Sequence, residues 1–448
     1  MVKKQFRFYF FLIQGYFKRH FLFIIISLIA ITALLVFLKT NRPQQPILRI
    51  GLIGQYEKTS LPRNISSLIS RGLTEINEKG EILPAVAESW QISEDQKTYT
   101  FIIRKNIVWD DGKTVKAKDI RYPYSNLDIT TPDDRTLKIQ LKEPFSPLLN
   151  LLAQPIFKKN FIGIDGYHLK TIQFRGNYIQ SLQLISPQKK PKIEFKFYPD
   201  EESIRNAFKL GKIDIIWNIL HPENLISYPN IKSQSQVSHQ QYTAVFLNLN
   251  KEKFSEKSVR QALAYTIPKP QGETRAKSPI NSNSWAYNDF VKPYELDISH
   301  ARELLEKTHQ EEMTIELATL PNLLDLAEKI KEDWNKIDVQ VNIRVVNFIP
   351  EDFEALLSTQ QIPLDPDQYW FWHSSQQKTN ITNLSNPRID QLLEEGRQVL
   401  ELKKRREKYL DFQRFLLEES PAIFISHPTY YYICRRGFEN YEIPLYNK

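Results

Sequence analysis

An uncharged run of eighteen residues near the N-terminus constrains this chain more than any other feature. Residues 21–38 read FLFIIISLIAITALLVFL and include no charged side chain. At about 1.5 Å of rise per residue, a helix of this length nearly crosses a hydrocarbon core of about 30 Å, and Lys39 can complete the span by snorkelling. A buried core helix fits the cationic flanks and the missing polar face poorly. The run therefore predicts a transmembrane helix over residues 21–39.

The distribution of charge predicts how this helix is oriented. The chain carries 60 Lys+Arg and 52 Asp+Glu, a net charge of +8, yet residues 1–46 alone hold seven cations and no carboxylate. The remainder is thus nearly neutral, which argues against nucleic acid as a partner. Five cations precede the run and two follow it closely. The positive-inside bias places basic residues 1–20 in the cytoplasm and the main domain outside the plasma (inner) membrane, with a single pass.

A cleavable signal peptide is the rival interpretation of the same run. The chain continues as VFLKTNRPQQP, without a small-residue cleavage site, which favours an uncleaved signal anchor followed by a polar stalk over residues 40–46. The single cysteine, Cys434, is far from the run and cannot accept a lipid there. Its strand-like surroundings, TYYYICRRGF, predict a buried, inert thiol.

The external part, residues 47–448, mixes the two hydrophobic periodicities. Alternating or apolar runs predict strands at residues 47–55, 98–104, 135–141, 192–198 and 242–248. Helical spacing occurs at residues 201–210, 258–266, 298–307, 323–337, 388–400 and 403–419. From residue 290 onward helices and strands alternate, which is typical of an α/β layer with a partly parallel sheet. We expect mixed α/β lobes of unlike character, with the Pro-, Ser- and Asn-rich residues 268–284 as a loop between them.

Sequence motifs for catalysis are missing. The chain contains no GxxxxGK[ST], no GxGxxG after a strand, no HExxH and no GxSxG. Its eight histidines are scattered, and the carboxylate doublets at residues 394–395 and 418–419 are typical of solvated helix faces. We therefore expect no enzyme activity, no cofactor and no metal.

Two aromatic clusters carry the positive signal for binding. Residues 365–376 read DPDQYWFWHSSQ, and residues 281–289 read NSNSWAYND. Bulky rings with polar tips give a pocket wall large contact area with few rotamers to restrict. The alternative is that the rings only fill seams between lobes.

Several segments together resemble one family. Residues 72–120, GLTEINEKGEILPAVAESWQISEDQKTYTFIIRKNIVWDDGKTVKAKDI, are similar to the opening of the family 5 extracellular solute-binding proteins of the peptide/nickel class. VRQALAYTI (259–267), LDISHARELLEK (296–307), SNPRIDQLLEEGR (385–397) and YLDFQRFLLEESPAIFI (409–425) follow in the family's order. The resemblance is collinear from about residue 47 to residue 436.

The resemblance implies a fold and a way of working. The fold would be periplasmic-binding-protein-like (type II, cluster C-like), with two hinged lobes and an extra β-rich subdomain, preceded by one transmembrane helix. Lobe 1 would span about 47–250 with 429–448, and lobe 2 about 251–428. Such a protein closes on a ligand and passes it to a permease. The resemblance also implies a monomer that binds a peptide or similar small solute and serves an ABC permease in the membrane.

The aromatic clusters and the resemblance together give the candidate ligand-binding residues. They are Trp285, Tyr287, Asp365, Asp367, Trp370, Trp372, His373 and Ser374, with Asn248 as a weaker candidate. For His373, a hydrogen-bonded loop residue remains the alternative. In peptide-binding relatives an acidic residue receives the ligand's ammonium group, and the corresponding position here falls near Ile362.

The chain also departs from the family elsewhere. Residues 268–279 differ from the usual helix, and residues 119–136 look abbreviated. These departures motivate an alternative, a degenerate sensor or scaffold that has lost its ligand. A surface hydrolase is the third alternative.

Overall fold

The computed structural model describes residues 21, 23, 25–27, 29–34, 47–57, 61–77, 80–124, 127–186, 191–308 and 313–439. Within the predicted transmembrane segment, the described residues between 21 and 34 are helical, and their apolar side chains are exposed, Phe23 at 73%. Among the described residues, no helix is long and apolar enough to cross a membrane. The rest of that segment, residues 1–20 and the stalk over residues 40–46 lie outside the described residues.

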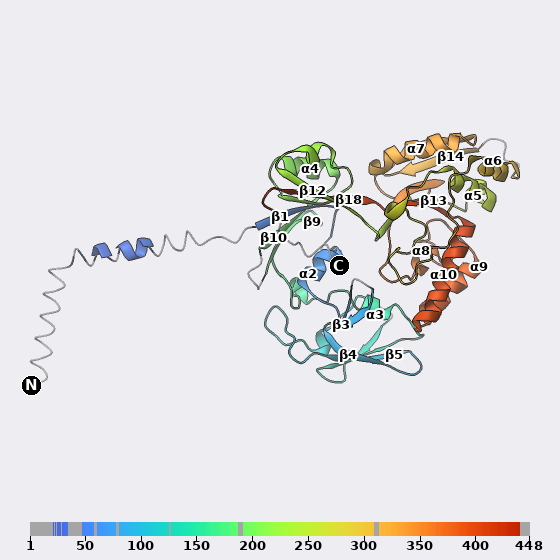
Figure 1. Ribbon diagram of the computed structural model, residues 1–448. Helices are drawn as coiled ribbons and strands as arrows, with labels where there is room; N and C mark the ends of the chain where they lie inside the picture. Colours follow the sequence, from blue (N-terminus) through green and yellow to red (C-terminus); the bar gives the residue numbers. More distant parts are fainter. Residues whose placement is uncertain are drawn as a thin grey trace, which may run out of the picture.

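The first sheet is mixed and has helices on both faces (Figure 1). Its central strand β1 pairs in parallel with β10 and β11, and the other pairs are antiparallel. In sheet order the strands are β12 (Ile231–Val237), β18 (Thr429–Arg435), β11 (Ile215–Ile219), β1 (Ile47–Ile53), β10 (Lys192–Tyr198), β9 (Tyr178–Ile185) and β8 (His168–Arg175). Helix α2 (Arg63–Ile69) packs on one face and α4 (Glu201–Lys209) on the other. We call this part lobe 1.

A β-rich subdomain is inserted into lobe 1 between residues 73 and 164. It has its own apolar core, with the fully buried Trp109 and Phe101 near its centre. Its sheet contains β4 (Ala87–Ile92), β5 (Thr98–Ile103), β7 (Thr136–Gln140) and β6 (Asp128–Thr130), beside the pair β2 (Thr74–Ile76) and β3 (Ile82–Pro84). The short helix α3 (Leu148–Leu151) closes the subdomain on the side of the second sheet.

The second sheet forms lobe 2 with most of the helices. Its strands, in sheet order, are β15 (Val339–Val345), β14 (Met313–Thr319), β16 (Ala355–Gln361), β13 (Gln241–Leu247) and β17 (Ala422–Ser426). The helices are α5 (Lys257–Thr266), α6 (Ile298–Glu306), α7 (Leu324–Asn335), α8 (Tyr369–Trp372), α9 (Pro387–Gln398) and α10 (Leu402–Glu419). One apolar core joins this sheet to these helices. Polar caps fix helix starts here, since Asp297 accepts a bond from the His300 amide of α6 and Asn386 caps α9.

Two segments, which we call the crossing segments, carry the chain between the sheets. The first, residues 238–240, joins β12 to β13, and the second, residues 427–428, joins β17 to β18. The segments lie side by side, because the Ser238 amide donates to the Pro428 carbonyl (2.9 Å) and the rings of His239 and His427 are 4.9 Å apart. The chain enters lobe 2 between Val237 and Gln241, whereas the sequence analysis placed this change near residue 250.

Several sequence-based expectations can be compared with the fold. The mixed α/β architecture is confirmed, and Cys434 is buried and free in β18. The expectation that residues 268–284 join the lobes is wrong, because they connect α5 to α6 within lobe 2. They pack along α10, where Ser278 Oγ donates to Gln413 Oε1 (2.8 Å). Pro, Ser and Asn content marks irregular backbone, but it does not say which parts of the molecule that backbone connects.

A glycine at the joint between lobe 1 and the subdomain gives a test of this packing. A Cβ atom at Gly163 would overlap the backbone carbonyl of Ile69 at the end of α2, so the two backbones would have to separate. We expect Gly163→Ala to lower the free energy of unfolding by about 3 kcal/mol, the upper end of the overpacking range. Gly112→Ala is the matched control, because its Cβ meets nothing within 4 Å and only its positive φ of 79° opposes it. That control should cost about 1 kcal/mol, and equal losses in urea unfolding would contradict the packing argument.

Candidate ligand-binding site

The directions of the parallel strands define where a ligand can meet both lobes. Gln361, the last residue of β16, pairs with Gln241, the first residue of β13 after the crossing. Ile219, the last residue of β11, pairs with Tyr431 near the start of β18. Because β14 and β15 run parallel to β16, and β1 and β10 run parallel to β11, all six carboxyl ends point toward the crossing segments. Ligands of open α/β sheets bind at the carboxyl ends of parallel strands, so the candidate site lies between the lobes.

The aspartate-rich loop after β16 stands at this edge, and Asp365 is its most tightly held residue. Asp365 is buried and accepts hydrogen bonds from both terminal nitrogens of Arg405, one of them 3.0 Å long. The Asp367 amide also donates to it (2.9 Å). A third donor comes from outside lobe 2, the Asn150 side-chain amide on α3 of the subdomain. Asp365 is therefore a charged group shared by the two sides of the site.

Asp367 is held by a second arginine, which also has an aromatic cage. Arg397 Nε lies 3.1 Å from Asp367 Oδ2, and its guanidinium lies over the rings of Tyr369 (4.2 Å), Phe145 (4.9 Å) and Trp370 (5.7 Å). Burial raises the pKa of the Asp367 carboxyl, and the charge of Arg397 opposes this shift. The Asp367–Arg397 ion pair is thus shielded from water and covered by aromatic rings. Cation–π contacts are strongest in such desolvated surroundings.

The same region makes the contacts between the subdomain and lobe 2. Ser146 donates its amide hydrogen to the Arg397 carbonyl (2.7 Å) and its hydroxyl hydrogen to the Gly396 carbonyl (3.1 Å). Gln398 donates to Glu143 of the subdomain (3.3 Å). These contacts join the subdomain to the end of α9, and the bond from Asn150 joins it to the aspartate loop; Figure 1 shows the subdomain beside lobe 2. The two sides therefore meet at the aspartate loop as well as at the crossing segments.

His373 and Ser374 are both tied to α9. Nε2 of His373 lies 3.1 Å from Glu394 Oε1, and its ring stacks on Tyr369 at 4.1 Å. Ser374 donates its amide hydrogen (2.9 Å) and its hydroxyl hydrogen (2.5 Å) to the two carboxylate oxygens of Asp390. Both side chains thus orient the loop through hydrogen bonds within lobe 2.

The remaining candidates divide between the site and the core. Trp285 joins the aspartate cluster, since the Arg405 guanidinium lies 5.5 Å over its ring, and the neighbouring Tyr287 is partly buried. Trp372 is 1% exposed and packs in the core of lobe 2. Asn248 lies at the other end of the sheet, where it bonds to Phe353 and Asn383. The structure therefore does not bring Asn248 together with the other candidates.

Exposed apolar side chains mark the lobe 2 side of the site. Trp370 is 54% exposed, and Leu364, in the loop after β16, is 45% exposed. The loop after β15 adds Phe348 (76%) and Ile349 (45%), which the sequence analysis did not select. The apolar pair Phe348 and Ile349 in VVNFIPEDF, shortly after an alternating strand, was the available signal. Exposed apolar groups at one edge of a sheet indicate a surface meant to be covered.

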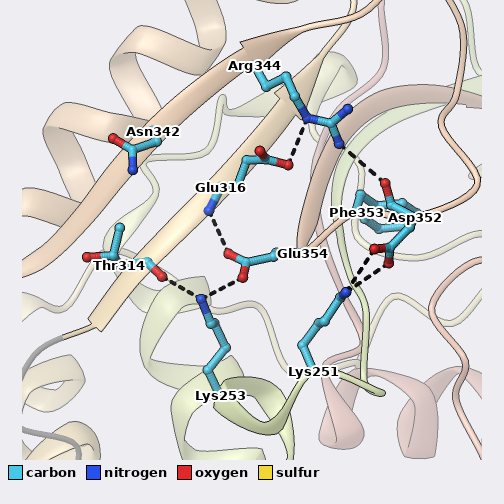
Figure 2. A pocket seen from close by; sticks show the side chains of 9 residues that line it. All are labelled: Lys251, Lys253, Thr314, Glu316, Asn342, Arg344, Asp352, Phe353 and Glu354. Atoms are coloured by element: carbon cyan, nitrogen blue, oxygen red, sulfur yellow. Dashed lines mark hydrogen bonds and ion pairs between the residues drawn. The ribbon is translucent and has the colours of Figure 1, made fainter.

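A cavity of about 440 Å³ opens elsewhere in lobe 2, toward the amino ends of β14 and β16 (Figure 2). Its charged side chains neutralise one another in three ion pairs, Lys251–Asp352 (2.8 Å), Lys253–Glu354 (2.8 Å) and Arg344–Glu316 (2.7 Å). Glu354 also accepts from the Glu316 amide (2.8 Å), so this network fixes β14 beside β16. The cavity faces away from the carboxyl ends, and we do not assign the ligand to it.

The described residues bear on two expectations, those for metal binding and for recognition of an ammonium group. Within them, no group of three or more His, Cys, Asp or Glu side chains is arranged to hold a metal ion. Ile362, where peptide-binding relatives were expected to carry an acidic residue, is buried, and its amide donates to the Gln240 carbonyl (2.8 Å). Ion pairs, rings and exposed apolar groups are therefore the means of recognition that the site offers.

Comparison with known proteins places this geometry in context. The profile of the bacterial extracellular solute-binding proteins, family 5 middle, matches residues 81–181 and 185–383. The dipeptide-binding protein of Escherichia coli (strain K12) is 25% identical over 451 residues, which cover 81% of this chain and 84% of that protein. The dipeptide-binding protein DppE of Bacillus subtilis (strain 168) is 23% identical and covers 81% of each chain.

Solved structures show the same fold. NikZ from Campylobacter jejuni, in complex with Ni(L-His), superposes with a TM-score of 0.74 at 21% identity, over 87% of this chain and 94% of that one. The oligopeptide-binding protein AppA from Bacillus subtilis, in complex with a nonapeptide, gives 0.71 at 20% identity, over 90% and 97%. The expectation of a periplasmic-binding-protein-like fold is confirmed.

The buried pair of Asp365 and Arg405 gives a test of how the site is held. Arg405→Met leaves the Asp365 carboxylate buried with its charge uncompensated, and we expect a loss of about 3–5 kcal/mol in unfolding free energy. Arg414→Met is the control on the same helix, because its ion pair with Asp411 (2.9 Å) is exposed. The control should cost less than about 1 kcal/mol. The double variant Asp365→Asn/Arg405→Met should regain part of the loss, and similar losses in both single variants would contradict the assignment.

Proposed function

Because the chain belongs to the family 5 bacterial extracellular solute-binding proteins, we propose that it is the extracytoplasmic binding component of an ABC-type importer. It binds a peptide or a similar small solute between its lobes and presents it to a permease in the membrane. The observation that carries this proposal is the set of exposed apolar side chains, Trp370 and Phe348 foremost, at the carboxyl edge that faces lobe 1.

The charge balance of the site supports a ligand of mixed or no net charge. Asp365 is neutralised by Arg405, and Asp367 by Arg397, so neither carboxylate is free to attract a cationic ligand. An extended peptide presents backbone donors and acceptors in every residue, and a strand-like mode of binding uses these while side chains rest on apolar surface. The names of the dipeptide-binding relatives agree with this class of ligand.

Closure of the lobes is the proposed mode of action, without any chemical step. Residues 238–240 and 427–428 act as the hinge, because they are the short links between two separately packed cores. Few residues need to change φ and ψ for such a motion. The bonds from Ser146 and Asn150 to lobe 2 lie where a closed state would be held.

The N-terminal segment is proposed as an uncleaved membrane anchor. Its described residues are helical and expose Phe21, Ile29 and Leu34, among others. Burial of these apolar side chains in lipid would stabilise such a helix. The cationic flanks orient it with the N-terminus in the cytoplasm and the lobes outside.

Peptide binding can be tested with single aromatic substitutions. We expect Trp370→Ala to weaken peptide binding about 30-fold, the loss typical of a ring at the centre of an interface. Phe290→Ala is the control, since Phe290 is 96% exposed on the loop that packs along α10, and its affinity should stay within about twofold. Calorimetry with a set of di- to pentapeptides measures both. Folded protein without saturable binding to any of them would favour the sensor or scaffold alternative.

The anchor can be tested by removing it. Full-length protein should sediment with membranes and resist extraction by high salt, because burial of apolar surface does not depend on ionic strength. A variant lacking residues 1–46 should be soluble. Protease added to intact spheroplasts should digest the lobes of the full-length protein. Full-length protein recovered in the soluble fraction, or lobes that stay protected, would contradict the proposed topology.

A further inference from the structure

A small cavity with basic walls lies beside the edge strand β17 of lobe 2, apart from the interlobe site. Its volume is about 10 Å³, and β17, the end of α5 and the irregular residues 268–294 enclose it. Space of about this size holds a single water molecule or a small ion. Four of the residues that line it are cationic and none is acidic, namely Lys269, Arg275, Lys277 and Lys292.

Two of the four cations are already compensated by neighbouring side chains. Lys277 forms an ion pair with Asp289 (2.6 Å). Lys292 lies over the rings of Tyr265 (5.5 Å) and Tyr294 (5.0 Å). The ring faces and the Asp289 carboxylate attract these two charges away from the space between them. The other two cations therefore decide what the cavity can hold.

Among the described residues, neither Lys269 nor Arg275 forms an ion pair at contact distance, although the Glu295 carboxylate favours the charged form of both and opposes the lowering of each pKa. Lys269 Nζ donates to the carbonyls of Ala264 and Tyr294, and one terminal nitrogen of Arg275, Nη2, donates to the Pro293 carbonyl. The other, Nη1, is buried and has no hydrogen-bond acceptor among the described residues. A buried N–H without an acceptor costs about 1–3 kcal/mol, and more when the group is charged.

The lowered pKa of Lys269 also indicates that positive charge in this cavity is poorly compensated. Burial, with a smaller effect from the nearby charge of Arg275, lowers the pKa of the ammonium group to about 7 against the weaker opposing effects of Glu295 and Asp333. The pocket therefore holds more positive charge than its surroundings compensate. A neutral water molecule could accept a hydrogen bond from Arg275, but it could not offset that charge.

We propose that this cavity is a binding site for a small monovalent anion of the size of chloride. The anion accepts the free Nη1–H of Arg275 and compensates the charge of Lys269. Larger anions such as phosphate or a carboxylic acid exceed the available volume. The site also lies next to the hinge, because Arg275 bridges to Ser426 at the end of β17 and the His427 amide donates to the Thr274 carbonyl (2.7 Å). A bound anion thus stabilises the loop around Arg275, which is bonded to the crossing segment at residues 427–428.

Thermal unfolding of the detergent-solubilised full chain tests this site. Sodium chloride should raise Tm by about 3 °C over sodium gluconate at equal ionic strength, with saturation as chloride increases. Arg275→Gln should abolish this difference, whereas Arg414→Gln, an exposed arginine of α10, should retain it. The shift should be larger at pH 6 than at pH 9, because Lys269 is charged at the lower pH and largely neutral at the higher one. An equal Tm in both salts would overturn the proposal.

A second measurement covers the case in which Arg275→Gln does not fold. Crystals of the unaltered protein soaked in sodium bromide should give an anomalous peak within hydrogen-bond distance of Arg275 Nη1. Density at that position without an anomalous signal would identify water instead and would overturn the anion site. Neither measurement depends on the transported ligand, so the proposed function stands or falls separately.

Discussion

The two short links between the sheets, residues 238–240 and 427–428, are the constraint on which the rest of this structure depends. Because the links lie side by side, β13 of lobe 2 and β18 of lobe 1, which follow them, begin close to each other. Strands β11 and β16 run antiparallel to β18 and β13, so the carboxyl ends of β11, β16 and the strands parallel to them lie beside the links. Loops that follow the parallel strands of either sheet are thereby brought between the lobes. The location of the site follows from strand direction before any side chain is considered.

The buried charges of the aspartate loop contribute geometry more than stability. Taking a carboxylate and a guanidinium out of water costs several kcal/mol per ion, and their attraction roughly repays it. What the pairs do provide is a fixed loop, since Asp365 also accepts from Asn150 and from the Asp367 amide. The Arg397 guanidinium that pairs with Asp367 also lies over the rings of Tyr369 and the exposed Trp370, so this ion pair helps to position the exposed ring.

Periodicity in the sequence predicted much of the fold, because it reports which residues a strand or helix must bury. The strand expected at residues 192–198 has these bounds in β10, and the helix expected at 403–419 differs from α10 by one residue. Partners across the fold could not be predicted in this way. Arg405 is one of four consecutive basic residues, and only the packing of α10 decides which of them reaches Asp365. Likewise, Trp370 and Trp372 share a four-residue helix that is too short to show its buried face.

The buried Ile362 constrains how a peptide's amino group can be recognised in the proposed complex. Its backbone is bonded to Gln240 of the hinge, and its side chain is 4% exposed. A carboxylate there would be desolvated beside apolar core, so acquiring one would cost stability without placing a charge in the site. Because Asp365 and Asp367 are already neutralised by arginines, ring faces such as that of Trp370 are groups of this loop that could still attract an ammonium. A ring face attracts an ammonium more weakly than a free carboxylate does, so recognition at this loop depends less on the charge of the peptide's end.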